Sequence, residues 1–407
     1  MMIVSLGLGK FLSIGQFGGG DVRLWEILLI MYIIFSFLKS LLIGKLIIRD
    51  VIPLFLIIPY FYSTILSGMN FLDYNDWLRR MTLVVLFILL YFVVSQNNGT
   101  NKFPDYIKLI ALPGVLIATW GLVEFFLFPS ELQTFGMLPR ARAFFEEANE
   151  FSLYLTLPFG FLLALLFFRG DTTRKIRLMY IIGLLIVIMA QILTFSRGGW
   201  FSFVVQLSIL FIIINKSVKS NLRKILSYTS ILITVLFIIN FYNPEILSKV
   251  FSLVSYRLFT SFSIDDYSTV ERFMTIQNAL SINFSSIPNF IVGIGVGNLG
   301  ASIVNEASTS NYLVDILVET GIIGLISFSL FIIYILIISR NTFKLFKKIS
   351  DDDLYVVFVG AFISFIGLLT GGLTSSTHML CFFWFIIGLL FAINKKVIDQ
   401  IKERFLN

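Results

Sequence analysis

Charged side chains are scarce in this sequence. Asp, Glu, Lys and Arg make up 14% of its 407 residues, and 57% of the residues are hydrophobic. A soluble domain carries roughly 25% charged residues and could not bury this much apolar surface. The composition therefore excludes a two-domain soluble enzyme and a disordered chain. Many apolar runs approach the roughly 20 residues that a helix needs to cross a bilayer, which predicts an all-α polytopic membrane protein.

Cysteine and histidine are almost absent. The single cysteine, Cys381, lies inside an apolar run, so neither an intrachain disulfide nor a cysteine-based metal site is expected. One histidine, His378, argues equally against a histidine-based metal site. We therefore expect no metal and no other cofactor.

Hydropathy predicts about 12 transmembrane helices. The first predicted span is the weakest, because it is short, holds Lys10 and runs into three glycines, so an interfacial helix is the alternative. The spans divide the chain into helices with an outer loop over 129–150 (residues 1–242), a large loop (243–310) and further helices with a tail (311–407). They are predicted at residues 2–18, 24–42, 46–66, 81–95, 108–128, 151–168, 178–195, 200–214, 226–242, 311–339, 355–373 and 379–394.

The positions of Lys and Arg predict the orientation. With the spans alternating and both termini in the cytoplasm, most basic residues fall inside, which is the positive-inside pattern. The net charge of +7 is then a topology signal with weak attraction to anionic lipid, and no nucleic-acid partner is expected.

Arginine dominates the basic residues that this topology leaves outside. Lysine would satisfy a topology rule equally well, whereas arginine is preferred where a planar fork binds phosphate or carboxylate. Interfacial snorkelling of arginine is the alternative explanation. The outer basic residues are Arg23, Arg79, Arg80, Arg140, Arg142, Arg197, Arg257, Arg272 and one lysine, Lys249.

Ionisable residues are rare inside the predicted spans, which argues against an ion-coupled transporter. Glu124, Asp315 and Glu319 are exceptions near outer ends, and we expect them to line an outward-facing cavity. The long connections are both outside, so the chemistry is expected there. The loop 243–310 keeps apolar content and predicts a small helical subdomain.

The segment 194–200 reads Thr-Phe-Ser-Arg-Gly-Gly-Trp. We expect Arg197 at the outer membrane edge, with Gly198 and Gly199 permitting a tight turn and leaving backbone N–H groups open at a helix start. A helix N-terminus beside a guanidinium suits an anionic headgroup. An ordinary glycine turn with a snorkelling arginine is the alternative.

The outer loop before residue 151 carries two arginines followed by carboxylates. Arg140 and Arg142 precede Glu146, Glu147, Asn149 and Glu150. These charges either neutralise one another at the surface or form a mixed site, in which arginine holds phosphate while a carboxylate serves as a base or sugar ligand.

Glycines punctuate the end of the large loop. Asp265, Asp266, Glu271 and Arg272 precede an amphipathic stretch, after which Gly293, Gly295, Gly297 and Gly300 follow. The GxGxxG from Gly295 to Gly300 lacks a βαβ context, so it does not predict a dinucleotide site. It predicts a backbone bend before Ser310, Asn311 and Tyr312.

The order of these features resembles the O-antigen ligase/polymerase superfamily of bacterial envelope glycosyltransferases. The resemblance covers about 130–340 and rests on order and placement. It is carried by Arg140-x-Arg142, Glu147-x-Asn149, SRGGW at 196–200, the long outer loop, Glu271-Arg272 with the glycines downstream, Asn311, and Glu319-x-Gly321-Ile-Ile-Gly324.

The resemblance implies a C-type glycosyltransferase-like fold in the bacterial inner membrane, with its active site facing the periplasm and no metal. The donor and acceptor would be undecaprenyl-diphosphate-linked glycans, and a chain-length regulator protein would be a further partner. Arg197 and Arg272 would bind the donor diphosphate. Ligases of this superfamily place a histidine just before the asparagine, where this sequence has Ser310, which favours a polymerase.

A glycosyl diphosphate carries its own leaving group, so the enzyme needs only to stabilise departing charge and activate an acceptor hydroxyl. Candidate bases are Glu146, Glu147, Asp266, Glu271 and His378, although a lone interfacial histidine is more often a polar anchor. Further candidate substrate-binding residues are Arg140, Arg142, Asn149, Arg257, Ser310, Asn311 and His378.

Two other functions remain open. An O-antigen ligase would transfer the glycan to the lipid A core instead of to a second lipid-linked glycan. A lipid-linked glycan flippase belongs to a different class and would present basic residues along an internal cavity; arginines and a large loop on the outer side argue against it.

Overall fold

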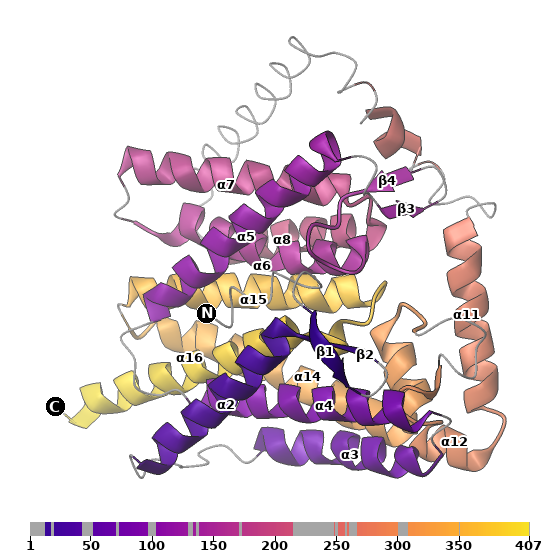
Figure 1. Ribbon diagram of the computed structural model, residues 1–407. Helices are drawn as coiled ribbons and strands as arrows, with labels where there is room; N and C mark the ends of the chain where they lie inside the picture. The colour runs from indigo at the N-terminus through magenta and orange to yellow at the C-terminus, as the bar shows by residue number, and fades with distance from the viewer. Residues whose placement is uncertain are drawn as a thin grey trace. The chain divides into compact units, whose positions relative to one another are not determined.

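The computed structural model describes residues 13–17, 20–42, 52–70, 73–96, 103–128, 133–135, 138–170, 173–214, 248, 251–256, 259, 267–299, 308–349 and 351–406. These residues form mainly α-helices, with two short antiparallel hairpins (Figure 1). Eight helices in this part of the chain are long and apolar enough to cross a membrane. The prediction of a helical, multi-pass membrane protein is confirmed at this level.

The eight helices coincide with eight of the predicted spans. The predicted span 24–42 is also helical, as α2 (Leu24–Leu42), and so is the described part of the predicted span 46–66, as α3 (Ile52–Ser67). The predicted span 226–242 lies outside the described residues. The eight are α4 (Tyr74–Ser95), α5 (Phe103–Leu127), α6 (Ala148–Phe168), α7 (Arg174–Leu193), α8 (Arg197–Ile214), α14 (Tyr312–Phe346), α15 (Asp352–Gly372) and α16 (Cys381–Leu406).

The predicted first span, 2–18, is wrong where the structure describes it. Residues Ser13–Phe17 form strand β1, which pairs with β2 (Gly20–Arg23) as an antiparallel hairpin. Glycine lowers helix propensity by up to about 1 kcal/mol per residue, and Gly15 and Gly20 both fall in this segment. The local preference of the backbone therefore overrides its hydropathy here.

The chain divides into two compact units. Unit 1 comprises residues 1–102, 270–351 and 372–407, and unit 2 comprises residues 103–269 and 352–371. Unit 1 is therefore built from three separated stretches of sequence. Helix α15 belongs to unit 2, although the helices before and after it in the chain, α14 and α16, belong to unit 1.

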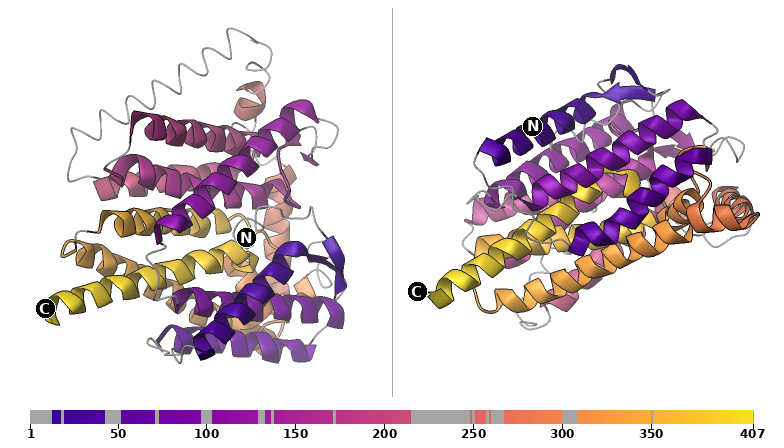
Figure 2. Two further views of the ribbon diagram at one scale, coloured as in Figure 1. Left: turned by 60° about the vertical axis from the view of Figure 1, so that its left-hand side comes forward. Right: turned by 90° about the horizontal axis from the view of Figure 1, so that it is seen from below.

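In unit 1, α3 packs along α14, and α4 packs along α16, as two views of the molecule agree (Figures 1 and 2). The core between α14 and α16 is aromatic. Phe331 stacks on Trp384, and Phe328 meets the same indole edge-on, with ring centroids 6.1 and 6.3 Å away. Both phenyl rings are fully buried, so α14 and α16 pack through an aromatic apolar core.

In unit 2, α6 is the central helix and is buried along nearly its whole length between α5, α7 and α8. Phe159 on α6 stacks on Phe203 of α8 with centroids 3.8 Å apart. A second hairpin, β3 (Gln133–Phe135) with β4 (Leu138–Arg140), precedes α6. It occupies part of the outer loop predicted over 129–150.

The described part of the large loop is helical, as predicted. It contains α11 (Tyr267–Asn283) and the short α12 (Ile287–Val292), which packs against α14. Ser286 caps α12 by accepting a hydrogen bond from the Asn289 amide, 3.2 Å away.

Candidate functional site

Helix α14 is broken near its start. Gly321 has φ 66° and ψ −171°, which only glycine adopts easily and which interrupts the helical hydrogen bonding. The carbonyl groups just before the break are bound from outside the helix. The Ile294 amide donates to the Val318 carbonyl at 2.9 Å, and Ser63 Oγ on α3 donates to the Thr320 carbonyl. The first turns of α14 thus form a separate short helix.

The glycine segment after α12 closes against this break. Gly293, Gly295 and Gly297 all have positive φ, which confirms the predicted bend. A side-chain carbon on Gly293 would lie 2.3 Å from the Glu319 carbonyl oxygen, and one on Gly321 would lie 2.3 Å from that of Ile291. Two backbones therefore meet at a separation that only glycines permit.

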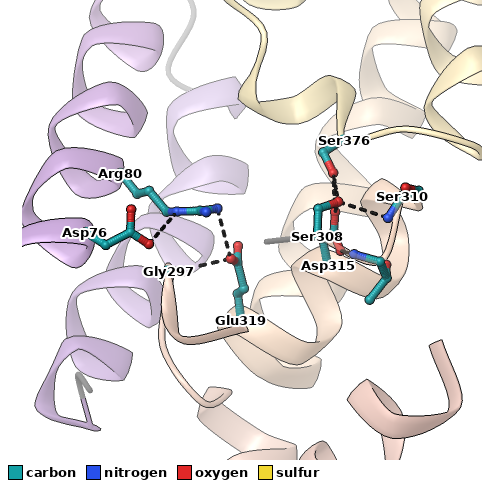
Figure 3. A network of polar contacts seen from close by, with 9 residues as sticks. Asp76, Arg80, Gly297, Ser308, Ser310, Asp315, Glu319 and Ser376 are labelled. Carbon is teal, nitrogen blue, oxygen red and sulfur yellow. Dashed lines mark hydrogen bonds and ion pairs between the residues drawn. The ribbon is translucent and has the colours of Figure 1, made fainter. Parts of the chain in front are cut away.

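Asp76, Arg80 and Glu319 form a charged network at the end of unit 1 where α4 and α14 begin (Figure 3). Arg80 Nε donates to Asp76 Oδ2 at 3.1 Å, and Arg80 Nη1 lies 3.7 Å from Glu319 Oε1. Glu319 is 4% exposed and also accepts from the Gly297 amide at 3.2 Å. The buried carboxylate therefore joins α4, α14 and the glycine segment.

A second network surrounds Asp315, one turn earlier on α14 (Figure 3). Its carboxylate is 3% exposed and accepts from the Thr309 amide at 2.7 Å and the Thr309 hydroxyl at 2.6 Å. Ser308 Oγ donates to it at 3.0 Å, and Ser376 Oγ donates to the same oxygen. Asp315 therefore fixes the residues before α14 to the turn before α16.

Ser310 and Asn311 have local structural roles in this network. Ser310 has φ 56°, and its amide donates to Ser308 Oγ at 2.9 Å. Asn311 is the N-cap of α14, and its side chain accepts from the Leu313 amide at 3.0 Å. The predicted helix start at 311 is confirmed to within a residue, and the capping amide explains the preference for asparagine there.

His378 lies in η4 (Thr377–Met379), between α15 and α16, and its side chain is buried. Its carbonyl accepts from Trp384 Nε1 at 2.8 Å. Burial lowers the pKa of His378 to about 4, although the Asp315 carboxylate acts in the opposite direction and Arg80 adds to the lowering. At neutral pH the imidazole is therefore uncharged.

In unit 2, Glu124 at the end of α5 binds the loop that carries the predicted arginines. Its Oε2 accepts from the Ala143 amide at 2.7 Å and the Arg142 amide at 3.1 Å. The Arg142 guanidinium lies 3.9 Å from the other oxygen, with the side chain 37% exposed. We expected Glu124, Asp315 and Glu319 to face an open cavity; all three are buried and bound to loop amides instead.

Arg140 and Asn149, which the sequence placed in one candidate site, do contact each other. The Arg140 side chain is buried, however, and does not lie at the surface. Arg140 is 6% exposed, and its Nη2 donates to Asn149 Oδ1 at 2.7 Å while its Nε donates to the Thr194 carbonyl at 2.7 Å. This geometry ties the loop after β4 to the end of α7.

Arg197 begins α8 and is half-buried, with Nη1 donating to Thr269 Oγ1 at 3.1 Å. The predicted role of the glycines needs correction, because the positive φ of this turn belongs to Phe195. Gly199 lies inside α8, where a side-chain carbon would stand 1.6 Å from Ser152 Oγ. The Gly199 amide donates to Ser196 Oγ at 3.4 Å, so it is not left open by a turn. Close packing of α8 against α6 is the reason that a glycine is needed here.

The remaining predicted residues lie on helix starts and in the large loop. Glu147 is the N-cap residue of α6, makes no capping hydrogen bond with its side chain and is exposed. Glu271 and Arg272 are half-buried on α11. Arg257 and Asp266 lie outside the described residues.

Sequence reasoning missed Asp76, Ser376 and Thr377 as parts of a polar site. Asp76 and Arg80 have the i, i+4 spacing of a helical ion pair, which was a readable signal. The others depend on contacts between distant segments, such as Ser376 with Asp315, and no local pattern reveals those.

Two polar ends therefore stand out. The polar end of unit 1 consists of Asp76, Arg80, Asp315, Glu319, Ser376 and His378, and the polar end of unit 2 consists of Glu124, Arg140, Arg142, Asn149 and Arg197. Among the described residues, no three His, Cys, Asp or Glu side chains gather into a group that could hold a metal ion. The side chains present can bind anions through arginine, bind hydroxyls and exchange protons.

Comparison of the chain with protein-family models and with curated proteins gives no match. A functional conclusion for this multi-pass membrane protein therefore depends on its own residues and their geometry.

Proposed function

We propose that this protein is a membrane glycosyltransferase, an O-antigen-type polymerase. It joins undecaprenyl-diphosphate-linked oligosaccharide repeat units on the periplasmic face of the bacterial inner membrane. The reaction needs no metal, because arginine side chains neutralise the diphosphate as it leaves.

The observation that carries this proposal is the position of Arg197. It is the first residue of α8 and is half-buried, so a cationic side chain is carried at the N-terminus of a helix, where the helix dipole is positive. Both attract an anion, and a diphosphate matches the planar fork of arginine. Arg272, on α11, has the same role in the proposal through the resemblance noted for the sequence.

Ser310 supports a polymerase over a ligase. A ligase-type histidine is missing from this position, and Ser310 instead adopts a left-handed backbone beside the Asp315 network. The acceptor in the proposal is therefore a second lipid-linked glycan.

Gene deletion followed by gel analysis of the lipopolysaccharide tests the proposal. A polymerase predicts loss of the ladder with one repeat unit still attached to the core. Core without any repeat, together with accumulated lipid-linked polymer, would identify a ligase. Repeat units trapped on the cytoplasmic side would identify a flippase, and an unchanged ladder would refute all three functions.

A further inference from the structure

Two buried polar atoms on consecutive residues of η4 have no hydrogen-bond partner among the described residues. They are Thr377 Oγ1 and His378 Nδ1. Thr377 is 0% exposed and His378 is 2% exposed. Buried polar atoms are almost always hydrogen-bonded in folded proteins, so two adjacent exceptions indicate a place where a ligand supplies the partner.

The turn that carries these atoms is fixed on both sides. Before it, Ser376 Oγ donates to Asp315 on α14, and after it, the His378 carbonyl accepts from Trp384 Nε1 on α16. Phe328 packs edge-on to the imidazole, with centroids 6.5 Å apart. These contacts hold the backbone and the ring of His378, while Nδ1 has no hydrogen-bond partner in the part of the chain that the structure describes.

The chemistry of the two atoms selects the ligand. In the tautomer with its hydrogen on Nε2, His378 Nδ1 is an acceptor, and a threonine hydroxyl both donates and accepts. A hydroxyl group matches this pair, because it has one hydrogen for the imidazole and lone pairs for the threonine. A carboxylate, Asp315, and a guanidinium, Arg80, both act on His378, so the hydrogen-bonding pattern of the two atoms, not net charge, selects the ligand.

We propose that Thr377 Oγ1 and His378 Nδ1 bind the attacking hydroxyl of the acceptor glycan, and that His378 takes its proton. This inference rests on the proposed function and adds the acceptor site to it. The acceptor oxygen forms a bond to the anomeric carbon of the donor, and the bond from that carbon to the phosphate oxygen breaks. The leaving diphosphate keeps the electron pair of that bond, and the hydroxyl proton moves to Nδ1.

Ser376, which precedes the pair, and Ser308, which hydrogen-bonds to Ser376, are half-buried. Because the imidazole is covered, the acceptor reaches it only when η4 shifts. Ser376 is the residue that releases or holds the turn, since its hydroxyl connects η4 to Asp315.

Three substitutions of His378 test the inference in the full-length protein, expressed in the deletion strain. His378→Asn keeps a polar group near the position of Nδ1 but cannot act as a base, and His378→Gln places its amide further out. His378→Phe removes the polar edge and keeps a ring. We expect at least 100-fold less polymer in all three. Thr377→Val, which removes the hydroxyl alone, should reduce polymer about tenfold.

Stability separates this role from a structural one. Because no described residue hydrogen-bonds to Nδ1, His378→Phe should unfold in detergent at the same temperature as the wild type or higher. Asn394→Leu is the matched control on α16, since Asn394 Nδ2 donates to Thr342 Oγ1 at 2.6 Å; it should unfold earlier and keep its ladder.

The outcomes distinguish the two proposals. A normal ladder in His378→Phe, with loss of the ladder in Arg197→Lys, would overturn the acceptor site and leave the polymerase intact. Loss of folded protein in His378→Phe would also overturn it. Normal polymer in His378→Asn alone would show that His378 binds the hydroxyl without taking its proton, which refutes the base role. An unchanged ladder on gene deletion would refute the polymerase and this inference together.

Discussion

Arg80 in unit 1 and Arg142 in unit 2 lie beside similar carboxylates but are held differently. In each unit a buried glutamate accepts a backbone amide from a neighbouring loop, Gly297 for Glu319 and Ala143 for Glu124. Arg80 has a close contact with Asp76 at 3.1 Å and a second with Glu319 at 3.7 Å, and is 21% exposed. Arg142 stands 3.9 Å from Glu124 and is 37% exposed.

The difference in ion-pair distance and exposure indicates which arginine side chain is better placed to bind a ligand. A guanidinium between two carboxylates has its charge compensated and its geometry fixed by the fold. A more exposed guanidinium at the limit of ion-pair distance gains little from its partner and can reorient toward phosphate. We therefore expect Arg80 to contribute more to the stability of the fold than Arg142 does.

The largest effect is expected at the break in α14, on which the polar end of unit 1 depends. Gly321→Ala adds a carbon 2.3 Å from the Ile291 carbonyl oxygen at a residue with φ 66°. We expect a loss of more than about 3 kcal/mol in unfolding free energy, or no folded protein. Gly170→Ala is the control, because no atom lies within 4 Å of the added carbon. Equal thermal unfolding of the two variants in detergent would contradict the rigid contact.

Lysine substitutions of the two proposed diphosphate arginines come next. Arg197→Lys and Arg272→Lys each keep the charge but lose the planar fork, so we expect about 100-fold less polymer on a gel of the lipopolysaccharide. Arg174→Lys, on the exposed first turn of α7, should leave the ladder unchanged. Near-normal chain length in both test variants would rule out the diphosphate role.

Stability measurements on Arg80 and Arg142 sharpen the comparison directly. Arg80→Gln leaves the buried Glu319 carboxylate without its cation and should cost about 2 kcal/mol of unfolding free energy. Arg142→Gln should change it by less than about 0.5 kcal/mol, and should instead shorten the polymer. The comparison fails if denaturant unfolding shows the reverse order.

The smallest expected effect is a pH dependence that arises from His378. Its pKa in the folded protein is lowered to about 4, so the unfolded chain, with an ordinary pKa of about 6.5, binds the extra proton first as the pH falls. Stability is nearly complete at about pH 7 and declines as the pH falls through about 6.5 toward 4, with about 1 kcal/mol lost by about pH 6.

The charged groups that act on His378 are Asp315 on α14 and Arg80 on α4, and Arg80 is itself paired with Asp76 and Glu319. His378→Phe should flatten the decline in thermal stability with falling pH, while Asn394→Leu should retain it. An equally steep decline in His378→Phe would assign the effect to one of the carboxylates.

The sequence predicted most helices, because a run of about 20 apolar residues is a local signal. It also located the start of α14 at Asn311 and the bend at Gly293 to Gly297, since caps and positive φ select particular residues. The charged networks escaped prediction because their partners are distant in sequence. Glu319 binds Arg80 across some 240 residues, and hydropathy assigns both residues only to the edge of a span.

Local sequence patterns gave wrong predictions for residues whose surroundings are set by packing between helices. Gly199 looked like a turn residue, but it permits α8 to approach Ser152 and Gln191 closely. Arg140 looked like an exposed cation, but the fold buries it against the Thr194 carbonyl and Asn149. Neither outcome follows from composition, because the neighbouring helix supplies the reason.

The break at Gly321 also bears on how this helix enters a membrane. An α-helix rises 1.5 Å per residue, so the part of α14 after Gly321 can by itself cross a hydrocarbon core of about 30 Å. Asp315 and Glu319 precede that part. Both carboxylates therefore lie outside the stretch that has to enter the hydrocarbon, where ionisable side chains are costly. A single glycine thus separates the apolar segment, which is long enough to span the bilayer, from the short helix that carries two buried carboxylates.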